Sequence, residues 1–140
     1  MSIAQSVLIV GGLLNLLFSI IASYFLYWQR IRHPETVAQR YGLVTHKVTL
    51  WNGFLLLGLS VAIEHTGYAA YVNIGLATAQ VIGTLLSSLS NVLRWARGVQ
   101  DQFAQGPEWR VRLIGLAHLI DLLVISALLV GVARTASGLW

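Results

Sequence analysis

The residues with the clearest chemical potential are an imidazole and a carboxylate inside an otherwise apolar stretch. His118 and Asp121 are three residues apart, a spacing that places both side chains on one face of a helix. At 1.5 Å rise per residue, Asp121 lies roughly 13 Å and His118 about 9 Å beyond Arg112. A carboxylate that deep in a bilayer costs at least ~2.5 kcal/mol, so we expect Asp121 to face the interior of a helical bundle.

Other apolar stretches place polar groups at a similar depth. Counted from the residues that flank each stretch, one layer collects Asn15, Ser19, Asn52, Thr84, Ser87, His118 and Asp121. One interpretation is structural: these groups hydrogen-bond to one another, at ~0.6 kcal/mol per bond. The other is a proton or ion relay, or a polar solute pocket, which needs a further titratable group toward the opposite surface. Glu64 is the candidate for that group, because it ends an i+4 series that starts at Asn52.

The histidines also bear on cofactor binding. Bis-histidine haem ligation requires two imidazoles at similar depth on facing helices. His46 is expected at one membrane surface and His65 at the other, so neither matches His118. No cofactor is predicted, although ligation through His118 alone, or binding of a quinone or pigment, stays open. The chain has no cysteine, a single methionine and no His-Glu-Xaa-Xaa-His motif, and we predict no metal site.

Long apolar segments must hold these groups. Of the 140 residues, 56% are hydrophobic and 10% are charged, and the mean hydropathy is +0.72, values typical of a lipid-embedded chain. Because a span requires ~20 apolar residues, we expect spans at about residues 3–28, 48–63, 68–93 and 111–133. The prediction is one transmembrane domain over residues 1–140, an all-α, antiparallel four-helix bundle integral to the membrane.

The basic residues predict the orientation of this bundle. Eight of the nine Lys and Arg residues fall in two stretches, Arg30 to Lys47 and Arg94 to Arg112. The positive-inside rule then makes the connections 29–47 and 94–110 cytoplasmic and leaves both termini outside, most simply in a bacterial inner membrane. The expected interfacial anchors are Trp28, Arg30, Arg32, Lys47, Arg94, Trp95, Arg97, Arg110 and Arg112. Anionic lipid headgroups account for this charge, so nucleic acid is not an expected partner.

Small residues provide faces on which helices can approach closely. Such residues recur at i+4 spacing in the third span, at Gly75, Ala79, Gly83 and Ser87. The first span carries a similar series at Gly11, Asn15, Ser19 and Ser23. The two series either meet within one bundle, or one of them docks another subunit.

The sequence favours a small non-enzymatic membrane protein, acting as a subunit or scaffold of a homo-oligomer or a larger membrane complex. The basis is the lack of a catalytic grouping together with the small-residue faces. The alternative is a small proton, ion or solute transporter or channel that uses Asp121, His118 and Asn52. A third hypothesis is a membrane subunit that binds haem, a quinone or a pigment through His118.

Overall fold

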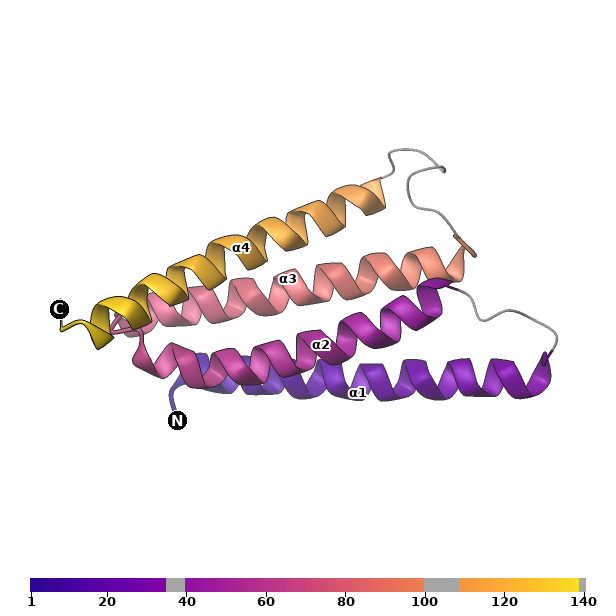
Figure 1. The fold of residues 1–140 in the computed structure, drawn as a ribbon, viewed down its shortest axis with the longest axis horizontal. Coiled ribbons are helices and arrows are strands. Elements are labelled where there is room, and N and C mark those ends of the chain that lie inside the picture. Colours follow the sequence, from indigo (N-terminus) through magenta and orange to yellow (C-terminus); the bar gives the residue numbers. More distant parts are fainter. Residues whose placement is uncertain (35–39, 100–108, 139–140) are drawn as a thin grey trace.

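A computed structural model describes residues 1–34, 40–99 and 109–138. This part of the chain folds into α1 (Ile3–Arg32), α2 (Arg40–Ala62), the short 3-10 helix η1 (Ile63–His65), α3 (Ala70–Ala96) and α4 (Trp109–Ala136). Consecutive helices run in opposite directions, and the start of α1 lies at the same end as the end of α4 (Figure 1). The predicted all-α four-helix bundle is confirmed, and all four helices are long and apolar enough to span a membrane.

We call the end that holds the start of α1, η1 and the end of α4 the terminal end. The opposite end, where α1 and α3 finish and where α2 and α4 begin, is called the loop end (Figure 1).

The helices continue past the predicted spans at the loop end. Helix α1 runs on to Arg32, α2 begins at Arg40 and not near residue 48, and α3 reaches Ala96. The connections are therefore shorter than the predicted 29–47 and 94–110, because a span estimate counts apolar residues only. Polar residues remain compatible with helix α2, since the hydroxyls of Thr45 and Thr49 donate to carbonyls four residues earlier at 2.6 Å and 2.8 Å.

Helices α1 and α2 pack closely because glycines face each other. A Cβ atom added at Gly12 would lie 3.1 Å from the Gly53 carbonyl oxygen, and one added at Gly53 would lie 3.1 Å from the Gly12 oxygen. The side chain of Leu16 packs against Gly53, where an added Cβ atom would lie 2.7 Å from it. Absence of a side chain at both positions lets the two backbones approach.

The terminal end contains the apolar core. Its buried residues come from all four helices and η1: Ala4, Leu8, Leu56, Ile63, Ala77, Val124 and Leu128. Helix α4 is attached here by Tyr68, whose hydroxyl donates to the Ala127 carbonyl at 2.8 Å. Gly131 completes the contact, because a Cβ atom at this position would lie 2.9 Å from the Thr66 carbonyl oxygen and 2.7 Å from the Tyr68 ring.

The loop end is more open. Within the described residues, α4 packs mainly against α3 and η1, whereas α3 also packs against α1 and α2. Helix α4 diverges from α3 toward its own N-terminus, so the two helices are farthest apart at the loop end (Figure 1). This divergence, held at the other end by the Tyr68 and Gly131 contacts, creates the space described next.

Candidate functional site

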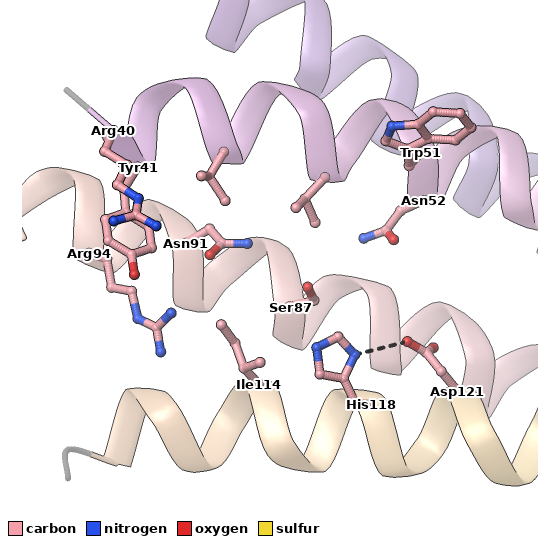
Figure 2. A pocket seen from close by; sticks show the side chains of 12 residues that line it. Arg40, Tyr41, Trp51, Asn52, Ser87, Asn91, Arg94, Ile114, His118 and Asp121 are labelled. Carbon is pink, nitrogen blue, oxygen red and sulfur yellow. Dashed lines mark ion pairs between the residues drawn. The ribbon is translucent and has the colours of Figure 1, made fainter. Parts of the chain in front are cut away.

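A cleft of about 460 Å³ lies between α2, α3 and α4 in the loop-end half of the bundle (Figure 2). Each helix lines it with residues that recur every turn, which places them on one face. The lining residues are Arg40, Tyr41, Val44, Val48, Trp51 and Asn52 from α2, Ser87, Asn91 and Arg94 from α3, and Ile114, His118 and Asp121 from α4. Side chains from α2 and α4 point toward each other across α3, which forms the floor (Figure 2).

Asp121 marks the deep end of this cleft. One carboxylate oxygen, Oδ1, accepts a hydrogen bond from Gln80 Nε2 at 2.6 Å. The other, Oδ2, lies 3.9 Å from His118 Nδ1, too far for a direct hydrogen bond and close enough for one bridging water. The Asp121 side chain is 25% exposed and that of His118 is 71% exposed. The carboxylate thus faces the interior, as the sequence predicts, while the exposed imidazole lies one turn nearer the loop end (Figure 2).

Basic and aromatic side chains occupy the loop end of the cleft. Arg94 is only 2% exposed, and its guanidinium carbon lies 5.3 Å from the centre of the Tyr41 ring, within the range of a cation–π contact. Arg40 lies beside them (Figure 2). Arg94 was expected as an interfacial anchor, but it is buried, because it lies seven residues after Ser87 and so on the same inward face of α3.

The polar layer expected at one depth divides between the cleft and the helix contacts. The structure brings Asn52, Ser87, His118 and Asp121 into the cleft. The remaining members, Asn15, Ser19 and Thr84, are buried in contacts of α1 with its neighbours.

Asn15 forms a bridge between α1 and α3. Its Nδ2 donates to Gly11 O at 3.0 Å and to Thr84 Oγ1 at 3.5 Å, and its Oδ1 accepts from Ser88 Oγ at 3.4 Å. Asn52 reaches the same region, with its Nδ2 3.5 Å from the Thr84 carbonyl oxygen. These bonds fit the structural interpretation of this part of the layer.

Ser19 contacts α2 and not the cleft. Its hydroxyl is 2.9 Å from His46 Nδ1 and 3.0 Å from the His46 carbonyl oxygen. Ser19 is 1% exposed and His46 is half-buried, so this pair joins two helices outside the cleft.

Glu64 does not continue the polar path. It lies exposed in η1 at the terminal end, where its carboxylate accepts a hydrogen bond from the Ser2 hydroxyl. The i+4 series from Asn52 to Glu64 passes through Leu56, a fully buried member of the apolar core. The sequence spacing is correct, but a core leucine separates the two polar groups.

The small-residue face of α3 is used in different ways along its length. A Cβ atom at Gly83 would lie 3.0 Å from Ile120 and 3.3 Å from Asp121 Oδ1, so this part of the face packs against α4. Ser87 lines the cleft, and Ala79 packs against the apolar core. Gly75 has nothing within 4 Å among the described residues. In the first span, Gly11 and Asn15 face α3 at Val81 and Thr84, which lie outside the α3 series.

Most of the other expected anchors lie at the surface of the loop end. Arg32 stacks over Trp28, with its guanidinium carbon 4.1 Å from the ring centre. Trp95 instead packs inward, edge-on to Phe25 at 6.1 Å. Exposed side chains are found at Arg30, Lys47, Arg97 and Arg112, and the side chain of Arg110 lies outside the described residues.

Gln80 and Asn91 belong to the site but were not predicted. Asn91 follows Ser87 by four residues, and Gln80 precedes Thr84 by four. Extending the polar face of α3 by one turn in each direction would have identified both. Tyr41 was also missed, because it lies in a segment expected to be a connection.

Among the described residues, no three His, Asp or Glu side chains gather as a metal site requires. No protein-family model, no curated protein and no solved structure matches the chain. Its function is therefore inferred from the residues of the cleft.

Proposed function

We propose that this protein is a small, non-enzymatic membrane transport protein that admits an ion or a polar solute from the loop end into the cleft between α2, α3 and α4. The ligand is held near Asn52, His118 and Asp121. The observation that carries the proposal is the cleft itself: about 460 Å³ between three helices, in which Asn52, His118 and Asp121 lie among apolar side chains. Each of these helices is long and apolar enough to cross a membrane.

The cost of burying polar groups supports this function over purely structural hydrogen bonding. Polar and ionisable groups within a bilayer are costly, and they normally face a partner or a hydrated cavity. Asn15 and Thr84 are satisfied by helix contacts, but Ser87, Asn91 and His118 face the cleft (Figure 2). Water or a polar ligand that enters the cleft can hydrogen-bond to these three side chains.

The distribution of basic residues sets the direction of access in this proposal. With both loop-end connections cytoplasmic and both termini outside, the cleft opens to the cytoplasm. The apolar core, which includes Leu8, Leu56 and Leu128, then lies between Asp121 and the outside. Such an arrangement is that of a transporter open to one side of a bacterial inner membrane.

Cysteine labelling tests the cleft directly, because the chain has no cysteine of its own. Ser87→Cys places a thiol in the cleft, and Ser90→Cys is its matched control. Ser90 lies three residues nearer the loop end of the same helix, is fully buried and is not a lining residue.

In sealed vesicles, a charged thiol reagent that does not cross membranes is expected to label Ser87→Cys from the loop-end side and to leave Ser90→Cys unlabelled. Labelling that is slow and equal at both positions would contradict a hydrated cleft. Labelling of Ser87→Cys from the terminal side alone would contradict the direction of access.

A role as a subunit or scaffold is a second proposal, favoured by one observation. Gly75 and the neighbouring Tyr71 are exposed on α3, and no described residue lies within 4 Å of a Cβ atom at Gly75. That part of the small-residue face is open to a second copy or another transmembrane subunit. Cofactor binding through His118 is a third hypothesis, and the absorption spectrum of the purified protein tests it; a colourless sample would contradict bound haem or pigment.

A further inference from the structure

The side chain of Gln80, which hydrogen-bonds to Asp121, has a partner for only one of its two polar atoms. Gln80 is fully buried, and its Nε2 donates to Asp121 Oδ1 at 2.6 Å. Its Oε1 is also buried and has no hydrogen-bond partner among the described residues. A buried amide oxygen without a donor is costly, at about 1–3 kcal/mol, so this arrangement calls for a functional explanation.

We propose that Asp121 is the proton-binding group of the cleft and that Gln80 is the positioning residue that accommodates both of its protonation states. This inference rests on the proposed transport function and names the proton as the ion. An ionised carboxylate only accepts hydrogen bonds, whereas a protonated one also donates. A glutamine amide carries a donor and an acceptor side by side, about 2.3 Å apart, and so can serve either state.

Rotation of the Gln80 amide by half a turn exchanges its two ends. In the ionised state, Nε2–H donates to Asp121 Oδ1, as the structure shows. When Asp121 gains a proton, the rotated amide presents Oε1 to the new O–H group, and the orphaned oxygen gains a partner. The bond from Nε2 to Asp121 is given up in exchange, so one end of the amide bonds to the carboxyl group in each state.

The groups around Asp121 favour a proton over a metal cation. Alkali and alkaline-earth cations bind to several oxygen ligands at once. Here the carboxylate forms a hydrogen bond with one nitrogen, Gln80 Nε2 at 2.6 Å, and an ion pair with another, His118 Nδ1 at 3.9 Å. A proton needs one oxygen only, and the carboxylate itself disfavours an anion.

The proton arrives through the cleft. Among the described residues, the other titratable groups that line it are Arg40 and Tyr41 from α2, Arg94 from α3 and His118 from α4. The two arginines lie at the loop end, and Arg94 is eleven residues, about 16 Å along α3, from Gly83, which contacts Asp121. His118 is the near neighbour, and its exposed ring is placed to pass protons between cleft water and the carboxylate.

The chemical step is a simple proton transfer. A hydronium ion in the cleft, or the protonated His118 ring through one bridging water, loses a proton, and a new O–H bond forms on Asp121. The donor becomes water or neutral imidazole. Beyond Gln80, the apolar core that contains Ala77 and Val124 closes the bundle, so the site connects with the loop end.

Infrared difference spectroscopy of the reconstituted protein tests the amide rotation. As the pH is lowered, a protonated-carboxyl band is expected that is missing in Asp121→Asn, which separates it from the four other acidic residues of the five in the chain. A shift of a glutamine amide carbonyl band should accompany it and be missing in Gln80→Leu. A carboxyl band that appears without any amide change would overturn the role of Gln80.

Proton flux into liposomes gives the functional readout. Flux is expected to be lost in Asp121→Asn and to fall about tenfold in Gln80→Leu, the effect of losing one hydrogen bond to a charged group. Gln29→Leu is the matched control, because Gln29 lines an apolar groove between α1 and α3, away from Asp121, and its flux should be unchanged. Size-exclusion chromatography and circular dichroism show whether each variant is folded.

The two proposals fail in different ways. If Ser87→Cys cannot be labelled from the loop end, the transport function itself is wrong. If it is labelled, but neither the carboxyl band nor the flux depends on Asp121, the cleft takes a ligand other than a proton. Unchanged flux in Gln80→Leu, with flux lost in Asp121→Asn, would leave the proton site standing and remove Gln80 from it.

Discussion

The terminal end and the loop end of this bundle contain the same four helices and differ in how α4 is held. At the terminal end, Tyr68 and Gly131 fix α4 against η1 and the start of α3, and the space between the helices is filled by an apolar core. At the loop end, α4 diverges and polar side chains line a cleft (Figure 1). One fixed end and one open end together produce a cavity that reaches the middle of the bundle and stops there.

Asp121 lies at the boundary between the open end and the closed end. It is the last lining residue on α4 before the core, in which Val124 is the next buried position on that helix. A carboxylate one turn farther along would be enclosed by apolar side chains, and one turn earlier it would be exposed at the rim. The boundary between the two ends is therefore the one depth at which a carboxylate is both sheltered and reachable.

The largest difference is expected when a serine is replaced by leucine in each end and the proton flux and the free energy of unfolding are compared. Ser87→Leu places an apolar side chain in the cleft between the loop end and Asp121. Proton flux in liposomes should fall about 100-fold, since a charge that must pass an apolar barrier meets ~2.5–3.5 kcal/mol. The free energy of unfolding should change little, because open space is being filled.

Ser60→Leu is the counterpart in the closed half. Ser60 is 4% exposed and its hydroxyl donates to Leu57 O at 2.7 Å. Overpacking should lower the free energy of unfolding by ~1–3 kcal/mol. Equal destabilisation by the two leucines, measured by denaturation in detergent micelles, would mean that the two ends are packed alike.

The next test weakens the contact that holds α4 at the terminal end. Gly131→Ala adds a Cβ atom 2.9 Å from the backbone oxygen of Thr66, so α4 must shift and the free energy of unfolding should fall by ~1–3 kcal/mol. Gly115→Ala is the matched control, because nothing described lies within 4 Å of that position on the same helix. It should be neutral or stabilising by up to ~1 kcal/mol. If both glycines tolerate alanine equally, α4 is not held at Gly131.

A smaller effect on stability is expected when the Tyr68 hydroxyl, which bonds to α4, is removed. Tyr68→Phe removes the hydrogen bond to Ala127 O and keeps the ring that packs on Gly131. The free energy of unfolding should fall by about 1 kcal/mol. Tyr71→Phe, at an exposed position, should have no measurable effect, and thermal denaturation in the same detergent compares the two.

The sequence predicts the level of the site along the helices better than it predicts which residues line the site. Distances along each helix follow from a fixed rise per residue, so Asn52, His118 and Asp121 were expected at about one level, and the structure brings them to one cleft. The direction in which a residue points is harder to predict in a lipid-embedded helix, because leucine, isoleucine and valine suit lipid and core equally.

Two residues show what local patterns miss. Arg94 has the sequence environment of a surface anchor, next to Trp95 at the end of an apolar span, and is nevertheless buried against Tyr41. Gln80 continues the polar face of α3, but its partner Asp121 is forty-one residues away, so the pattern within α3 does not reveal the bond. The divergence of α4 depends in the same way on contacts between Gly131, Thr66 and Tyr68, which no spacing within one helix reveals.

The smallest effect on stability is expected at Gly75, on a part of α3 that packs against none of the described residues. Gly75→Leu adds a side chain where no described atom lies within 4 Å, so the free energy of unfolding of the single chain should change by no more than ~0.5 kcal/mol. The mass of the protein purified in mild detergent is the informative measurement. If the face at Gly75 docks a second copy or another subunit, leucine there should reduce the mass to that of the single chain, because close backbone approach is lost. Ile82→Ala, at an exposed position of the same helix, should leave the mass unchanged. A wild-type protein that is already a monomer would remove the subunit role and leave the cleft as the functional part of the molecule.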